Sequence, residues 1–141
     1  MKEIKLEGKY IERDDVKSPY CEVQNVKILD DELKSGFYLI DTGCDFDVVI
    51  SEVFVSPNIK RLLFTSKNCR IERNPDGIVS DIITNGLLIL SANYSKKVLV
   101  DITYDNHFLG EKIIGIGVIN DFLTTLDPFK DKINLTRLTS S

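Results

Sequence analysis

Cysteine and histidine are scarce in this chain of 141 residues, and their scarcity narrows its chemistry. The three cysteines, Cys21, Cys44 and Cys69, are an odd number at wide spacing, and no two of them form a Cys-x-x-Cys pair. A disulfide framework uses an even set, so we expect three reduced thiols. His107 is the only histidine, which disfavours a zinc site and leaves any Ser-His or Cys-His mechanism dependent on one loop residue. We therefore expect no metal and no cofactor.

Long apolar runs and an excess of positive charge are also missing. No apolar segment approaches the length of a membrane span, and the first ten residues, MKEIKLEGKY, lack the apolar region of a signal peptide. We thus expect a cytoplasmic protein without membrane contacts. With 18 basic and 22 acidic residues, the formal net charge is −4, which disfavours a nucleic-acid binder.

Short segments of β type fill most of the chain. Alternating or continuous apolar residues predict strands near 4–6, 21–28, 37–40, 48–50, 98–102 and 133–138. Asn85-Gly86 lies between two apolar segments and predicts a tight hairpin turn. Residues 61–64 are compatible with either a strand or a turn.

One segment near the C-terminus has helical periodicity. Its apolar residues share one helical face, and Pro128 ends the pattern; these residues are Val118, Ile119, Phe122, Leu123 and Leu126. The sequence therefore predicts many short strands and one short helix. This combination favours a closed or sandwich-like β fold.

The segment 37–44 carries the clearest chemical signal. An apolar strand leads directly into Asp41, Thr42 and Gly43, and a second apolar strand follows at 48–50. Asp41 is thus predicted at a strand end with its carboxylate free to point out of the sheet, and Gly43 permits close approach of the backbone to a ligand. All three residue types also favour turns, so an ordinary turn is the alternative interpretation.

A second apolar segment, 112–114, ends at Gly115, and the expected helix follows it. Gly115 and Gly117 do not form a dinucleotide-binding fingerprint, because Asn120 occupies the position of the third glycine. On its own, this segment is interpreted as a core strand followed by a helix start.

The order of strand, Asp-Thr-Gly, strand, hairpin, strand, Ile-Ile-Gly, helix and strand resembles the retropepsins, the retroviral-type aspartic proteases and their cellular relatives. The resemblance begins near residue 20 and reaches residue 138. It implies a protease domain, 20–141, and an N-terminal extension, 1–19, that belongs to the same domain. The fold it implies is all-β, a closed acid-protease barrel with one short C-terminal helix.

The resemblance also implies roles for the residues of the first loop. Asp41 falls on the catalytic aspartate, Thr42 on the threonine that ties the two active-site loops together, and Gly43 on the glycine that contacts substrate. Cys44 stands where the family usually has alanine or serine. Asp45 matches an acidic position that contacts the substrate backbone in the viral enzymes.

Further site residues follow from the same resemblance. Ile114 and Gly115 match the apolar-glycine loop below the active site. The flap, a hairpin that closes over substrate, is expected at 69–83, with substrate contacts from the tip residues Asp76, Gly77 and Ile78. Two features depart from the viral enzymes: the flap has one glycine, and Ile116 replaces an arginine whose bridge to an acidic residue supports their dimer.

Aspartic protease chemistry needs two neighbouring carboxylates, and this chain has one Asp-Thr-Gly. Asp45 and Asp47 are too close in sequence to Asp41 to form a second site, and Asp101, Asp121 and Asp127 lack the turn context. We therefore expect a homodimer in which Asp41 faces its own copy across a twofold axis. The C-terminal strand at 133–138, expected as an exposed edge, is the candidate interface element.

Two hypotheses of different class remain. The first is an aspartic endopeptidase that hydrolyses a peptide or protein substrate with a water activated between two Asp41 carboxylates. The second is a non-catalytic peptide-binding or dimerisation module on the same fold, favoured by the sparse flap glycines and the missing arginine. A small β-barrel for nucleic acid is the weakest alternative, because the net charge is negative.

Overall fold

The structure is a computed structural model that describes residues 2–29, 31–33, 35–63, 65–73, 75, 77, 79–105, 107 and 110–139. Most of them lie in strands, which confirms the all-β class. The strands are β1 (Lys2–Arg13), β2 (Val16–Val23), β3 (Asn25–Ile28), β4 (Asp31–Leu33), β5 (Gly36–Ile40), β6 (Val48–Ser51), β7 (Cys69–Arg73), β8 (Val79–Ser91), β9 (Tyr94–Thr103), β10 (Lys112–Ile114), β11 (Leu123–Asp127) and β12 (Lys132–Thr139). The helices are a short 3₁₀ turn at Glu52–Phe54, α1 (Pro57–Leu63) and α2 (Ile116–Ile119). No helix in this part of the chain is long and apolar enough to cross a membrane.

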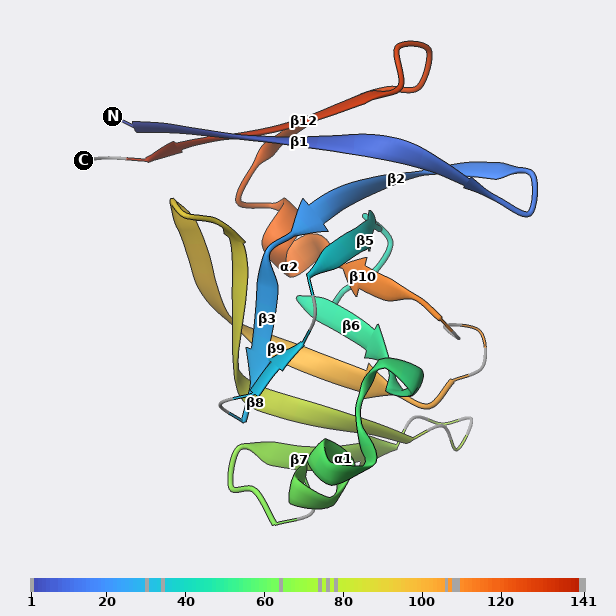
Figure 1. Cartoon of the computed structure of the whole chain (residues 1–141), viewed down its shortest axis with the longest axis vertical. Helices are drawn as coiled ribbons and strands as arrows, with labels where there is room; N and C mark the ends of the chain where they lie inside the picture. The colour runs from blue at the N-terminus through green and yellow to red at the C-terminus, as the bar shows by residue number, and fades with distance from the viewer. Residues whose placement is uncertain are drawn as a thin grey trace.

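The strands of the described residues form one sheet in the order β11-β12-β1-β2-β5-β10-β6-β9-β8-β3-β4, and β7 pairs with β8 beside this path. The expected closed barrel is wrong, because closure requires β11 to pair with β4 and the two remain separate edges. Figure 1 shows the arrangement: β1 and β12 cross the top, β8 and β9 lie lower, and the short strands β5, β10 and β6 lie between them.

The centre of the sheet is built from three short buried strands. β10 lies between β5 and β6, parallel to the first and antiparallel to the second. β6 is in turn parallel to β9. Val48, Ile50 and Ile114 are almost completely buried, as expected for short continuous apolar runs that are covered on both faces. The strands predicted at 37–40 and 48–50 are therefore confirmed.

The predicted helix at 118–126 is largely wrong. α2 ends at Ile119, and the second half of the segment forms β11, which pairs with β12. The apolar period was misleading because Leu123 and Leu126 are exposed rather than packed on the core. β12 pairs with β11 on one side and β1 on the other, so the expectation of an exposed edge at 133–138 is also wrong.

Two further local predictions fail. Asn85-Gly86 is a register shift within the continuous strand β8, and the chain turns after Ser91, which pairs with Tyr94. A side chain at position 86 would come within 2.5 Å of Val100 Cγ2, so Gly86 serves close strand approach rather than a turn. Residues 61–64 were expected in a strand or turn, but the first three of them belong to α1.

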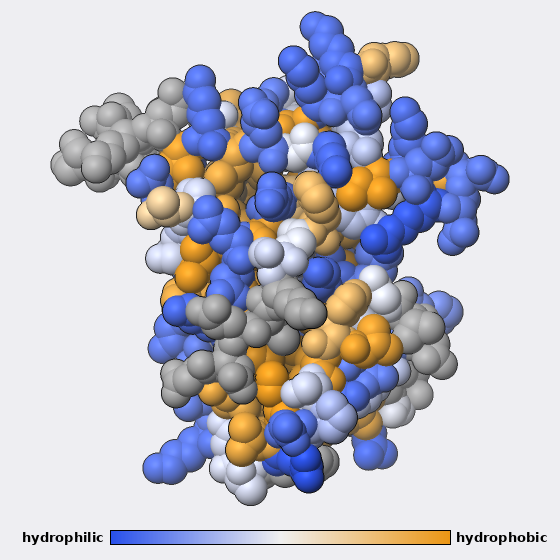
Figure 2. All heavy atoms as spheres, viewed as in Figure 1, coloured by the Kyte–Doolittle hydropathy of each residue, from blue (hydrophilic) through white to orange (hydrophobic). Residues whose placement is uncertain are grey.

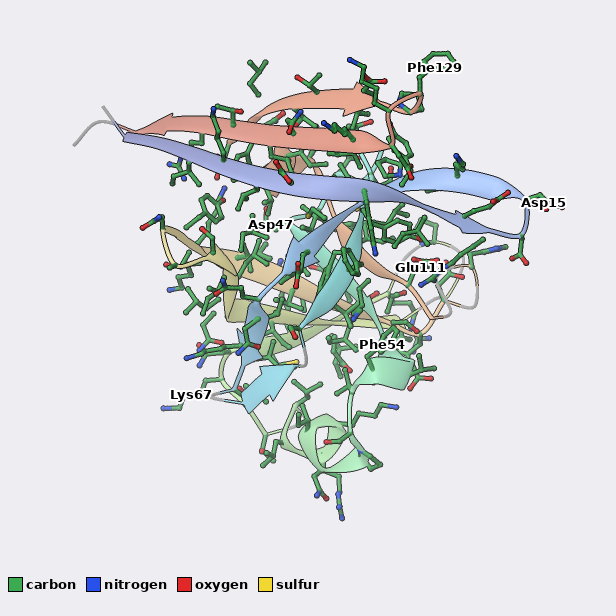
Figure 3. All side chains as sticks on the ribbon, turned by 45° about the horizontal axis from the view of Figure 1, so that its top comes forward. Asp15, Asp47, Phe54, Lys67, Glu111 and Phe129 are labelled. Atoms are coloured by element: carbon green, nitrogen blue, oxygen red, sulfur yellow. The ribbon has the colours of Figure 1, made fainter. Side chains whose placement is uncertain are left out.

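The N-terminal hairpin is part of the same sheet. β1 pairs with β12, and β2 pairs with β5. The expected boundary between the extension, 1–19, and the domain, 20–141, therefore falls within the single strand β2. Figure 3 shows Asp15 at the tip of the hairpin, far from the central strands. Hydrophilic side chains gather over this upper part of the molecule in Figure 2.

Candidate active site

Asp41 follows β5 and begins a tightly held turn. Its backbone N–H donates to the carbonyl oxygen of Ile114 at 3.1 Å, which joins the turn to the end of β10. Its Oδ1 accepts a hydrogen bond from the Gly43 N–H at 2.9 Å, and its carbonyl oxygen accepts one from the Cys44 N–H at 3.2 Å. Asp41 is half-buried, whereas Thr42 and Gly43 are exposed. The turn therefore fixes the carboxylate and faces solvent.

The loop after β10 lies directly against this turn, as the resemblance implied. The Gly115 N–H donates to the Asp47 carbonyl oxygen at 2.9 Å, and the Ile116 N–H donates to that of Cys44 at 2.8 Å. A Cβ atom on residue 115 would lie 2.0 Å from the carbonyl oxygen of Phe46. Such a distance is impossible between real atoms, so the two loops meet this closely only with glycine at position 115.

Asp47 fixes the other end of the first loop. Its Oδ2 accepts a hydrogen bond from the Leu99 N–H of β9 at 2.9 Å, and its Oδ1 lies against Gly117 of α2. Figure 3 labels Asp47 near the middle of the molecule, below the layer of β1 and β12. In the sequence, Asp47 stands out only as a carboxylate too close to Asp41 to form a second catalytic site, and nothing there predicts these positioning contacts.

Lys96 and Asp121 support α2, the helix that follows the second loop. The Lys96 ammonium donates to the Gly117 carbonyl oxygen at 2.8 Å and to Asp121 Oδ2 at 2.9 Å. The Tyr94 hydroxyl donates to the same carboxylate oxygen at 2.8 Å. Burial acts to raise the pKa of Asp121, but the bonds from Lys96 and Tyr94 outweigh it and lower this pKa. This network supports α2 from Lys96 and Asp121, whereas Ile116, which replaces the arginine of the viral enzymes, has no charge with which to form an ion pair.

A cavity of about 370 Å³ lies beside the Asp41 turn. Four of the predicted site residues line it: Asp41, Gly43, Cys44 and Asp45. Glu72 and Arg73 of β7 and Ser80 of β8 form another part of its wall, so the hairpin expected as a flap does border the cavity. The volume lies within the range of ligand pockets, roughly 300–1,000 Å³.

The other predicted site residues that the structure describes lie outside this lining. Ile114 and Gly115 are buried beneath the first loop, where they support it through the backbone. Gly77 is exposed and has a φ of 81°, a conformation that favours glycine. Asp76 and Ile78 lie outside the described residues.

Asp101 of β9 is a second carboxylate in the cavity wall, a place that its sequence context, which lacks a turn, does not predict. It lies directly opposite Val49 of β6, and only 7% of its surface is exposed. The Ser80 hydroxyl donates to this carboxylate, while Oδ1 has no hydrogen-bond partner among the described residues. Burial, and then the charges of Glu72 and Asp81, raise the pKa of Asp101 to about 6.

The pattern of β9 explains the omission. Val98, Val100 and Ile102 alternate with Leu99 and Asp101, which places Asp101 on an expected solvent face. The end of β9 is instead buried on both faces, from Val100 through Thr103. A charged residue within a strand buried on both sides is the signal that identifies Asp101, and it needs the tertiary structure.

The thiols and the histidine form no second chemical centre in the described part of the chain. All three cysteines are free, and burial raises the pKa of the cavity residue Cys44, which opposes formation of a reactive thiolate. His107 is exposed in a turn, where its backbone N–H donates to Asp105. Across the described ranges, no three acidic, histidine or cysteine side chains lie close enough together to hold a metal ion.

No protein-family model matches this chain, and no curated protein sequence matches it either. The resemblance to the retropepsins therefore rests on the residues quoted above.

Proposed function

We propose that the chain is a retropepsin-like aspartic endopeptidase that acts as a homodimer, with one Asp41 carboxylate from each copy. The observation that carries this proposal is the Asp41 turn itself. Hydrogen bonds to the loop after β10 hold it rigid, and it borders a cavity that the β7–β8 hairpin helps to enclose. A fixed carboxylate next to a space for substrate meets the first requirement of this chemistry.

In the proposed dimer, the two Asp41 carboxylates share one proton, because two like charges in contact do not both ionise. The ionised carboxylate takes a proton from a water molecule, whose oxygen bonds to the scissile carbonyl carbon. The protonated carboxyl polarises and protonates the carbonyl oxygen. The tetrahedral intermediate then collapses as its C–N bond breaks, and the amine leaves with a proton from the pair. No covalent intermediate with the protein forms.

A twofold contact through the turn is favoured by what the turn exposes. Thr42 and Gly43 are exposed beside the half-buried Asp41, so the surface that carries the carboxylate is available to a second copy. An isologous contact places the same residues opposite each other. The contact proposed here is this loop face rather than β12, which lies inside the sheet.

The test compares Asp41→Asn with wild type and with a matched control. Asp15→Asn is the control, because Asp15 is exposed at a distant hairpin tip and its φ of 65° is one that asparagine also adopts. Each protein is incubated with a peptide library at acidic and at neutral pH, and its mass is measured by sedimentation. We expect dimers in all three samples, and cleavage by wild type and Asp15→Asn only.

The outcomes separate the two hypotheses. Cleavage by Asp41→Asn at the wild-type rate contradicts the aspartic mechanism. A wild-type protein that binds peptides without cleaving them supports the non-catalytic binding module. A monomer at every accessible concentration, also with a peptide-mimetic inhibitor present, contradicts the shared pair of carboxylates.

A further inference from the structure

Asp101 is a buried carboxylate that lacks a full set of partners. Its Oδ1 has no hydrogen-bond partner among the described residues, although 7% of the residue is exposed and one hydroxyl, that of Ser80, donates to the carboxylate. Burying a carboxylate without a counter-charge costs free energy. Buried polar atoms are almost always satisfied, so an unpaired oxygen on a carboxylate that lines a cavity requires an explanation, and a bound ligand of opposite charge is one.

The charges around Asp101 do not compensate it. Glu72 of β7 and Asp81 of β8 are both negative, so they repel the negative charge of Asp101. Glu72 also pairs with Arg70 at 2.9 Å, and the Tyr104 hydroxyl donates to Asp81 at 2.7 Å. Among the described residues that line the cavity, the charged ones are the carboxylates Asp41, Asp45, Glu72, Asp101 and Asp105 and the guanidinium of Arg73. The cavity wall is therefore strongly negative, and a cation is the ligand charge that it favours.

The residues that line the cavity with Asp101 indicate which kind of cationic group fits there. Val49 lies opposite Asp101 in the parallel β6–β9 pair, and Thr103 follows two positions along the same strand face. Both line the cavity together with Phe46, which is half exposed there. An apolar wall that leads to a buried carboxylate fits a side chain with an aliphatic stem and a positive end.

We infer that Asp101 forms a subsite for a cationic side chain, so that the cavity takes a peptide segment that carries a lysine or an arginine. This inference rests on the proposed peptide binding and adds its specificity. The N–H donors of the bound cation make charge-assisted hydrogen bonds to the Asp101 carboxylate and supply the counter-charge that it lacks. A neutral side chain of the same length leaves the carboxylate without a counter-charge, and this difference is the source of selectivity.

The experiment varies the ligand first. Octapeptide mixtures blocked at both ends carry one fixed central residue: lysine, norleucine, arginine, citrulline or glutamate. Binding is measured by affinity selection on Asp41→Asn, which does not cleave in the proposed mechanism, and cleavage is measured on wild type. We expect the lysine and arginine mixtures to be favoured over norleucine and citrulline by about ten- to a hundredfold, the value of a hydrogen bond to a charged group.

The experiment then varies the protein. Asp101→Asn is expected to lose the preference, in binding and in cleavage. Asp105→Asn is the matched control, because Asp105 lines the same cavity and its Oδ1 accepts a backbone hydrogen bond from His107, which asparagine also accepts. A preference that survives in Asp105→Asn and disappears in Asp101→Asn assigns the subsite to Asp101 rather than to the general negative charge of the cavity.

Each outcome decides one question. Equal binding of the lysine and norleucine mixtures, a preference for glutamate, or no binding of any mixture overturns the inference. An unchanged preference in Asp101→Asn overturns it as well. Cation-selective binding without cleavage supports the subsite and rejects the endopeptidase. Cleavage without cation selectivity supports the endopeptidase and rejects the subsite. The comparison between ligands needs no variant at position 101, so it decides the question even where Asp101→Asn does not fold.

Discussion

Replacement of Asp101 by asparagine removes a buried negative charge and nearly conserves the shape of the side chain. In the folded chain, burial and then the charges of Glu72 and Asp81 raise the pKa of Asp101 from 3.8 to about 6. The folded state thus holds this proton more tightly than the unfolded state does. Stability is therefore lost as the pH rises between these two values, and the loss totals about 3 kcal/mol at neutral pH.

Asparagine carries no charge at any pH and retains an oxygen that accepts the Ser80 hydroxyl. We expect Asp101→Asn to match wild type near pH 4, roughly the ordinary pKa of aspartate. At neutral pH we expect its free energy of unfolding to be about 1–3 kcal/mol higher. The gain falls toward the lower end of this range if the new amide N–H groups find no hydrogen-bond partners of their own. Urea unfolding at both pH values, at equal protein concentration so that association affects both proteins alike, measures the difference.

The control for this experiment is Asp15→Asn, an exposed substitution that we expect to change stability by less than about 0.5 kcal/mol at either pH. The reasoning is refuted if Asp101→Asn is less stable than wild type at neutral pH, or if its gain is the same at both pH values. A gain in stability together with a loss of cation selectivity shows that wild-type Asp101 sacrifices stability for binding.

Three further predictions concern the turn, the loop below it and the hairpin. Asp41→Asn keeps the fold and abolishes peptide cleavage, and the wild-type rate follows a bell-shaped pH profile with its optimum on the acidic side of neutral; kinetics across pH check both. Gly115→Ala lowers the free energy of unfolding, measured in urea, by about 1–3 kcal/mol, because the added Cβ would overlap the Phe46 carbonyl oxygen. The control Gly36→Ala changes it by less than about 1 kcal/mol, because the added Cβ meets only the flexible end of a lysine. Hydrogen exchange at 69–83 slows with saturating peptide-mimetic inhibitor, and equal exchange in both states contradicts the assignment of a flap.

The centre of the fold was predictable because its signals are local. The strands around Asp41 are short apolar runs between turn residues, and such runs form buried strands without any need for alternation. The approach of the loop at Gly115 to the Asp41 turn was implied by the family resemblance. Its physical basis, backbone hydrogen bonds between segments about 70 residues apart, is visible only in the folded chain.

Two of the failed predictions share one cause, which is that strand pairing overrides local preference. Asn85-Gly86 favours a turn, but β8 pairs with β9 on both sides of these residues, and the absence of a side chain at Gly86 serves the approach of Val100. The helical period of 118–126 is likewise overridden, because β12 offers an edge to which residues 123–127 pair. Propensity is a weak guide wherever a partner strand is available.

The two carboxylates of the cavity differ in how far a sequence can reveal them. Asp41 owes its position to the residues on either side, since a buried strand delivers it and Gly43 donates to its Oδ1. Asp101 owes its position to residues on other strands, Val49 on β6 and Ser80 on β8, and to the covering that buries both faces of β9. In the proposed enzyme, the strand-end position of the group that performs the chemistry is therefore encoded locally, although backbone hydrogen bonds to the loop after β10 hold its turn. The group that selects the substrate is positioned by the sheet. Selectivity in this fold is for that reason open to change through positions far from the Asp-Thr-Gly turn.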